Sequence, residues 1–274
     1  MDVVKFATNL AMTRAPIIFI RGFNSYSRED LRFGPLNLGP VHRHLQPEFE
    51  KHGYRFIALE RMGFGPLDEQ IERAQKQILT LRLGASFHLL GHSTGGVIAR
   101  GLAHALQNSQ RVLSVTTIVS PHRGSTLADQ AECFQAAHPF WYRFWKSAGY
   151  DVAARVPLLE PMKVKAMAEF NEKYPNLPNV QYASIVSGAP LKTLPLLMRM
   201  IGQFAANSNE VTDGVVEKAS QPWGEIIGDF VADHGAIIGF RTMLSPRSYE
   251  KTQLEFRNAV EQINRFYSRV EDLQ

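Results

Sequence analysis

The first half of the chain alternates short apolar runs with stretches of helical character, and this alternation constrains the fold more than any other feature. The apolar runs are typical of strands buried on both faces of a sheet. They occupy residues 16–20, 55–59, 86–90, 112–119 and, later, 180–186. Residues 67–81 and 94–106 lie between them and have the composition of helices, and a last helix is expected from an apolar stripe, 256–270. Strands that alternate with helices form parallel sheets, so we expect an α/β fold with helices on both faces of a mostly parallel central sheet.

Composition limits the domain count and the class of partner. The chain has 274 residues, 45% of them hydrophobic, which is enough for one domain over residues 1–274. Its 30 basic and 26 acidic residues form no long block of one sign, so we expect no nucleic-acid partner. No apolar run reaches the ~18 residues that span a bilayer, so we expect no transmembrane segment.

The N-terminal residues and the cysteine count bear on the compartment. The first twenty residues lack the clean apolar core and cleavage site of a signal peptide. The single cysteine, Cys133, excludes an internal disulfide and a cysteine metal cluster. We therefore expect a cytoplasmic protein without metal or cofactor, and secretion stays open as the alternative.

Residues 91–96 read Gly-His-Ser-Thr-Gly-Gly and directly follow the apolar run 86–90. This is the form of a nucleophile elbow, in which a strand turns sharply into a helix and the serine at the apex adopts a strained backbone conformation. Gly91 and Gly95 stand where that turn leaves no room for side chains. The motif predicts Ser93 as a covalent catalyst.

The residues on either side of the serine have separate expected roles. The amides at the start of the following helix point at the apex, so the Thr94 amide is a candidate oxyanion donor. His92 should point away from the serine because of the turn, into a packed or hydrogen-bonded position.

A serine hydroxyl needs a base, and the base needs an orienting carboxylate. In an elbow fold the chain order is serine, acid, histidine, with both partners on loops after later strands. The histidines that follow the serine are His104, His122, His138 and His234. His104 falls inside the expected elbow helix, whereas His234 lies late in the chain between small residues, shortly before the last helix.

Four aspartates are candidates for the acid. Asp213 follows a polar segment and precedes a glycine, as expected at a loop tip, although an ordinary Asp-Gly turn has the same sequence. Asp129 and Asp229 are less well placed, and Asp233 would have to hold the ring of its own neighbour.

The regular alternation stops at residue 126, where an aromatic segment begins. Pro139 can start a helix, and four aromatic residues share one side of it. They are Phe140, Trp141, Phe144 and Trp145. One interpretation is a helix packed on the core; the other is a helical lid or cap insertion over residues 126–175, whose aromatic side chains bind an acyl chain. The apolar stretch 194–204 either lines the same pocket or packs on the core.

Six motifs follow one another between roughly residues 15 and 240: PIIFIRGF, GHSTGG, SPHRGSTLAD, FNEKYP, TDGVV and ADHGAIIG. In this order the chain resembles the bacterial triacylglycerol lipases of the Pseudomonas and Burkholderia type, in the α/β-hydrolase superfamily. The resemblance implies the α/β-hydrolase fold, with Ser93 as nucleophile, Asp213 as orienting acid and His234 as base. It also implies that the amides of Phe23 and Thr94 form the oxyanion hole.

The resemblance implies a serine carboxyl-ester hydrolase, a lipase or esterase that acts on apolar acyl esters through an acyl-enzyme. Its partner would be a small ester or lipid substrate, with transient contact at lipid surfaces. A thioesterase or acyltransferase with the same triad stays open, as does a catalytically inactive hydrolase-fold binding protein.

The chain departs from the family pattern in three ways. Arg21-Gly22 stands where the family usually has His-Gly, and Ala236 replaces the aspartate through which secreted relatives often bind calcium. The cysteine pair of the secreted relatives is also missing.

Overall fold

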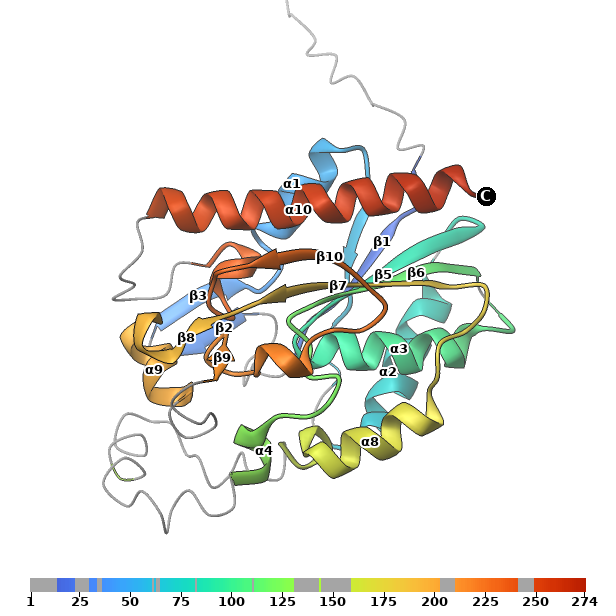
Figure 1. Ribbon diagram of the computed structural model, residues 1–274. Coiled ribbons are helices and arrows are strands. Elements are labelled where there is room, and N and C mark those ends of the chain that lie inside the picture. The colour runs from blue at the N-terminus through green and yellow to red at the C-terminus, as the bar shows by residue number, and fades with distance from the viewer. Residues whose placement is uncertain are drawn as a thin grey trace, which may run out of the picture.

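The computed structural model describes residues 14–22, 30–33, 36–60, 62, 65–81, 83–109, 111–130, 143, 159–202, 210–240 and 249–274. A parallel six-stranded sheet lies at the centre of this structure, in the order β10-β7-β6-β5-β1-β4 (Figure 1). The strands are β1 (Ile17–Ile20), β4 (Phe56–Ala58), β5 (Ser86–His92), β6 (Arg111–Ile118), β7 (Gln181–Ser187) and β10 (Glu225–Phe230).

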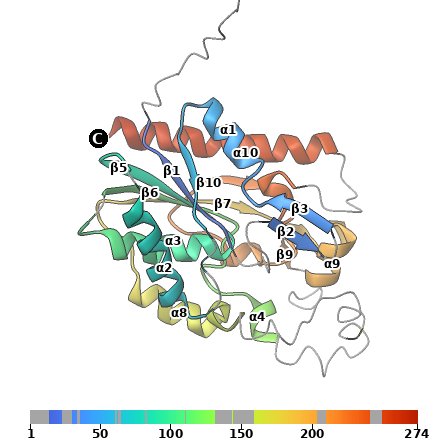
Figure 2. The ribbon, with the colours of Figure 1, turned by 180° about the vertical axis from the view of Figure 1, so that it is seen from behind.

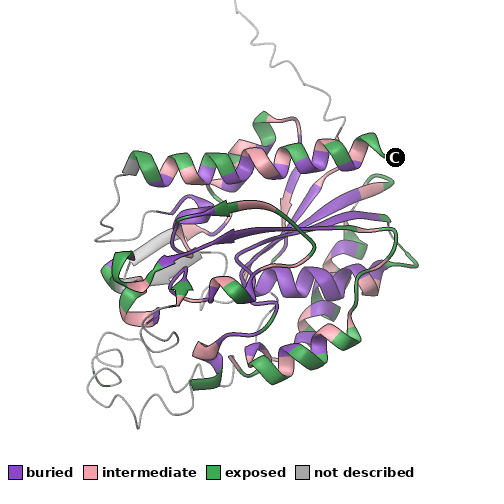
Figure 3. Cartoon of the chain, in the orientation of Figure 1, coloured by how far each residue is buried: buried purple, intermediate pink, exposed green. Residues whose placement is uncertain are grey.

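Helices cover both faces of the sheet, which confirms the predicted fold class (Figures 1 and 2). One face carries α1 (Leu45–Lys51) and α10 (Tyr249–Asp272). The other face carries α2 (Leu67–Thr80), α3 (Thr94–Leu106) and α8 (Val164–Lys173). The inner strands β1, β5, β6 and β7 are buried along most of their length (Figure 3), as expected of parallel strands covered from both sides.

Two hydrophobic clusters fill the space between the sheet and its two helical layers. In the first, α10 contributes the stripe that the sequence predicts: Phe256, Val260, Ile263, Tyr267 and Val270. In the second, α2 and α3 pack on the opposite face of the same strands. The length and apolar face of α10 therefore have a structural role.

Several short elements lie outside the sheet and its main layers. Two antiparallel pairs join β2 (Asp30–Phe33) to β3 (Leu36–Pro40) and β8 (Ala189–Pro190) to β9 (Val211–Thr212). The short helices are α4 (Thr126–Gln130), η3 (Glu160–Met162), η4 (Leu191–Thr193), α9 (Leu196–Gly202), η5 (Lys218–Ser220) and η6 (Ala236–Ile238). In the described part of the chain, no helix combines the length and the apolar character that crossing a bilayer requires.

The predicted lid over residues 126–175 is described mainly at its two ends. Its aromatic candidates Phe140, Trp141, Phe144 and Trp145, together with Cys133 and His138, lie outside the described residues. The two ends are bonded to each other, since the Ser125 amide donates to the Met162 carbonyl over 2.9 Å and the Val164 amide donates to Asp129 Oδ1 over 3.2 Å.

Helix α8 is the largest described part of that predicted lid. Its residues Met167 and Phe170 are buried in the second hydrophobic cluster, against the layer of α2 and α3. These two side chains therefore anchor α8 in the core of the domain.

Candidate active site

Ser93 lies between the end of β5 and the start of α3, in a strained backbone conformation. Its φ is 58° and its ψ is −135°, and among the described non-glycine residues only Val119 shares a positive φ. A non-glycine residue in this region persists only where its surroundings enforce it, and such residues gather at functional sites. The strand, sharp turn and helix of a nucleophile elbow are thus all present.

Three glycines make the turn sterically feasible. A Cβ on Gly91 would overlap the backbone of Gly96, and one on Gly95 would overlap the carbonyl oxygen of Ile20. A Cβ on Gly96 would overlap the Ser120 hydroxyl. The elbow is therefore packed against the ends of β1 and β6 with no space for side chains at these positions.

The chain leaving β1 passes directly over the serine. A Cβ built on Gly22 would lie 2.5 Å from the Cβ of Ser93 and 3.0 Å from its Oγ, so only glycine allows this approach. Arg21 before it is buried. Phe23, the predicted oxyanion residue, follows directly but lies outside the described residues.

Asp213 and His234 are hydrogen-bonded to each other. His234 Nδ1 lies 2.6 Å from Asp213 Oδ2, and because a carboxylate oxygen only accepts, Nδ1 carries the proton. Asp213 is fully buried, and its Oδ1 accepts from the amides of Val215 and Val216 over 2.9 and 2.8 Å. The backbone amide of His234 also donates to the Asp213 carbonyl over 2.9 Å. This geometry leaves His234 Nε2 available to accept a proton.

The other candidate acids have different partners. Asp229 pairs with Lys218, and Asp233 Oδ1 accepts from the amides of Gly235 and Ala236 over 3.1 Å each. Asp129 binds the first amide of α8.

The described alternatives to His234 as base are also engaged elsewhere. His104 contacts the Pro175 carbonyl. His122 is fully buried between Thr117 and Arg100, and burial together with the nearby Arg100 charge holds its pKa well below the ordinary value.

His92 joins the elbow to the loop of His234. Its Nε2 donates to the His234 carbonyl over 3.1 Å, and the two imidazole rings lie 4.8 Å apart between centroids. Burial, with the neighbouring His234, keeps the pKa of His92 well below its usual value, so the ring is neutral with its proton on Nε2. As expected, His92 occupies a packed, hydrogen-bonded position, and this contact brings the residue before Ser93 against His234.

Comparisons with known proteins show which proteins this chain is similar to in sequence and fold. A family model described as palmitoyl protein thioesterase matches residues 40–156. Triacylglycerol lipases of Pseudarthrobacter phenanthrenivorans and Burkholderia plantarii are each 32% identical over 129 residues, which is 45% of this chain and 38% and 34% of theirs. The chain thus matches little more than a third of these relatives' length.

Solved structures match over more of the chain. A Staphylococcus hyicus lipase covers 95% of this chain and 97% of its own, with a TM-score of 0.66 and 15% identity. A metagenomic carboxyl esterase, MGS0156, covers 93% and 76%, with a TM-score of 0.68 and 18% identity. The chain is thus similar to bacterial lipases over part of its length, and it has the α/β-hydrolase fold.

Several side chains that sequence reasoning missed hold the acid loop of this hydrolase fold in place. Gln221 Nε2 lies 3.5 Å from Asp213 Oδ2 and donates to the Ser187 carbonyl over 2.9 Å. Ser125, in the SPHRGS motif, donates to the Val215 carbonyl over 3.1 Å. Ser125 belongs to a recognised motif and Gln221 to none, and the sequence predicted no partner for either because their contacts join distant segments.

A buried arginine contacts His122 of the same SPHRGS motif. The Cζ atom of Arg100, on α3, lies 3.2 Å from the centroid of the Trp223 ring, and its Nη1 donates to Asn171 Oδ1 over 2.8 Å. Burial lowers the pKa of Arg100 to about 9. Arg100 therefore ties the elbow helix to α8 and to the segment before β10.

No cluster of three metal-ligating side chains occurs among the described residues, and Ala236 is buried in η6.

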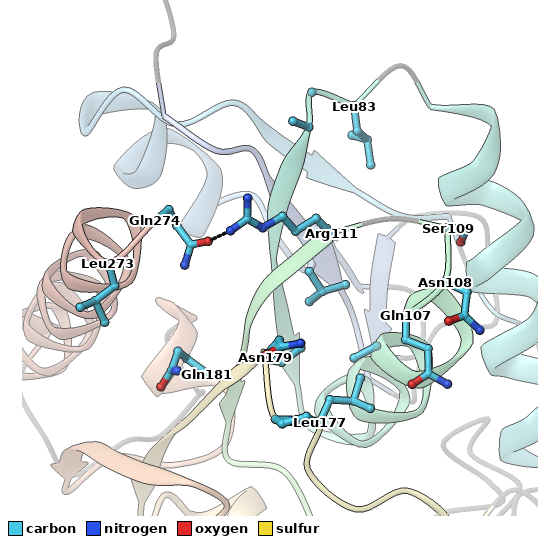
Figure 4. Close-up of a pocket in the computed structure, with 16 residues that line it drawn as sticks. Leu83, Gln107, Asn108, Ser109, Arg111, Leu177, Asn179, Gln181, Leu273 and Gln274 are labelled. Carbon is cyan, nitrogen blue, oxygen red and sulfur yellow. Dashed lines mark hydrogen bonds between the residues drawn. The ribbon is translucent and has the colours of Figure 1, made fainter.

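A cavity of about 1100 Å³ lies at the other end of the sheet (Figure 4). Its lining includes Asn108 and Ser109 after α3, Arg111 at the start of β6 and Gln181 at the start of β7. Ser93 follows the carboxyl end of β5, so this cavity is at the opposite ends of the strands from the elbow. It does not serve the Ser93 hydroxyl.

Proposed function

We propose that this protein is a serine carboxyl-ester hydrolase, a lipase or esterase, with Ser93 as nucleophile, His234 as general base and Asp213 as orienting acid. The observation that carries the proposal is the 2.6 Å hydrogen bond between buried Asp213 and His234, on a loop that also bonds to the neighbour of the elbow serine. The order of serine, acid and histidine along the chain agrees with this class of triad.

In the proposed reaction, Ser93 Oγ attacks the ester carbonyl carbon while His234 Nε2 takes the hydroxyl proton. Asp213 keeps Nδ1 protonated and stabilises the imidazolium that forms. His234 then gives the proton to the leaving alcohol, which leaves an acyl-enzyme on Ser93. Water, deprotonated by the same histidine, hydrolyses the acyl-enzyme and restores the serine.

The amides of Thr94 and Phe23 are the proposed oxyanion donors. Thr94 is the first residue of α3, where the helix dipole favours negative charge. The close passage of Gly22 over Ser93 supports the role of Phe23, the next residue along. Each such donor contributes ~3 kcal/mol to transition-state stabilisation.

We propose an apolar acyl chain as the part of the substrate that is recognised. Helix α9 is apolar apart from Arg199, and its Met198 packs against Gly214, next to the acid. The similarity to proteins named triacylglycerol lipase supports the same substrate class. We further propose that Phe140, Trp141, Phe144 and Trp145 bind the acyl chain as part of a helical insertion within residues 126–175, and that this insertion contacts lipid surfaces transiently.

For the compartment we propose the cytoplasm. One cysteine, Cys133, leaves no internal disulfide to form, and disulfides are a feature of oxidising compartments. Localisation of the tagged chain in its host checks this assignment.

A thioesterase is the second candidate, because the matching family model is that of palmitoyl protein thioesterases. The same acyl-enzyme forms from a thioester, with a thiolate in place of the alkoxide as leaving group. A binding protein without turnover is less well supported, because it gives no reason for a paired Asp213 and His234 on a loop that contacts the residue before a strained serine.

A panel of matched oxoesters and thioesters tests the proposal. We expect kcat/KM for oxoesters to rise from short to medium acyl chains and to exceed that for the thioester of the same acyl group. A steep fall beyond short chains would contradict the apolar acyl site. A preference for thioesters would favour the second candidate, and saturable binding without hydrolysis would favour a binding protein.

A further inference from the structure

The side chain of His92 bridges two segments that lie 142 residues apart in sequence. The backbone of His92 is fixed in the sheet, since it pairs with Ile118 of β6, and the next amide, that of Ser93, donates to the Ile118 carbonyl over 2.9 Å. From this fixed position, Nε2 reaches the His234 carbonyl. The contact thus fixes the His234 carbonyl relative to the end of β5, the strand that leads into Ser93.

Three groups of His234 are held in the structure, and they are held from two sides. Asp213 binds the backbone amide and Nδ1, whereas His92 binds the carbonyl. The residue after His234 is Gly235, whose backbone is the least restricted of any residue type. Without the His92 bond, the peptide between His234 and Gly235 would keep the bond from the Gly235 amide to Asp233 Oδ1, but its carbonyl oxygen would lose the donor that His92 supplies.

The ring of His92 is suited to a permanent donor role next to a base. It is 6% exposed, and it packs against the ring of His234. A neutral ring does not oppose the positive charge that His234 acquires during proton transfer, whereas a cationic neighbour would. The Nε2 proton stays in place through the cycle because a carbonyl oxygen can only accept.

We propose that His92 is a positioning residue that holds the loop of the base, His234, in register with the nucleophile Ser93. This inference rests on the function proposed above. It assigns a role in the reaction to the residue that the elbow motif leaves unspecified between its first glycine and its serine.

Two variants with side chains of similar length distinguish the effect of the N–H donor of His92 from the effect of its side-chain volume. His92→Gln keeps an N–H donor near the position of Nε2, and His92→Met fills similar space without one. Removing one hydrogen bond of this kind costs a factor of roughly three to ten. We expect the Met variant to lose that factor in kcat for ester hydrolysis at an unchanged KM, and the Gln variant to recover most of the loss.

Amide hydrogen exchange gives a second readout that does not depend on turnover. We expect the amides of residues 234–236 to exchange faster in the Met variant than in the Gln variant, with the amides of β5 and β6 unchanged. All rates are compared below the unfolding transition of the least stable variant. Equal kcat and equal exchange in the two variants, whether or not they match the wild type, would overturn the positioning role.

A parallel Ser93→Ala variant keeps the two proposals distinguishable. Ester hydrolysis that persists in this variant would refute the proposed function whatever His92 does. Loss of hydrolysis in Ser93→Ala, together with equal Met and Gln variants, would refute the role of His92 alone.

Discussion

Replacing Asp213 by asparagine tests the geometry around the base most sharply, because the structure fixes which way the new amide must face. Oδ1 of Asp213 accepts two backbone amides, from Val215 and Val216, so the carbonyl oxygen of the asparagine takes that place. Its NH₂ group then faces His234 Nδ1 and the Gln221 amide nitrogen, at positions now 2.6 and 3.5 Å from Oδ2.

The consequence for His234 is a change of tautomer. A donor in place of Oδ2 forces Nδ1 to become an acceptor, and the ring proton moves to Nε2, which can then no longer accept from Ser93. In serine hydrolases with this arrangement the equivalent substitution lowers kcat by a factor of ~10⁴. At about 1.4 kcal/mol for each factor of ten, this corresponds to about 5 kcal/mol in the activation free energy.

The assay is kcat/KM for a chromogenic medium-chain ester, with thermal unfolding measured on the same samples. Asp229→Asn is the matched control, because Asp229 is an exposed partner of Lys218 and has no contact with His234 among those described. We expect a loss of roughly 10⁴ for Asp213→Asn and less than about twofold for the control. A folded Asp213→Asn protein within about tenfold of the wild type would refute the reasoning about the triad.

Two further predictions concern stability. Gly95→Ala should lower the free energy of unfolding by at least about 2 kcal/mol in urea titrations, because its Cβ would overlap the Ile20 carbonyl. Gly84→Ala is the control, because its Cβ meets nothing within 4 Å. Equal stabilities of the two variants would contradict the packing of the elbow. Stability should also fall with pH below about 6.5, because burial lowers the pKa of His88, His92 and His122 in the folded state and the unfolded chain therefore binds more protons there. Each of these histidines contributes up to about 1.4 kcal/mol per pH unit, and urea titrations that give equal stability at about pH 7.5 and pH 5.5 would contradict their burial as neutral rings.

The sequence predicts the central strands well because their physical signal is local. Strands covered on both faces form nearly continuous apolar runs, as in Ile17–Ile20. The edge strand β10 reads EIIGDF and was missed, since its outer side is exposed and Gly228 and Asp229 interrupt the apolar run. Helix α8 falls inside the predicted lid because an apolar helix face has the same sequence pattern whether it packs on a core or on a cap.

In the candidate site, too, the features that the sequence predicts are those set by neighbouring residues, and the features that it does not predict are contacts between distant residues. The elbow was predictable because its glycines and its serine are neighbours in sequence, and the strained φ of Ser93 follows from them. The choice of Asp213 over Asp229 depends on a bond across 21 residues and on two backbone amides, which composition and spacing do not encode. The contact of His92 with His234 left no sequence signal at all.

Covalent labelling with a fluorophosphonate probe tests the central claim most directly, because the probe reacts with a serine only when a base activates it. We predict one adduct, located by peptide mass spectrometry on Ser93, that is absent from Ser93→Ala and forms far more slowly in His234→Ala. No adduct on the wild-type protein, or an undiminished adduct on Ser93→Ala, would contradict the assignment of Ser93 as the nucleophile.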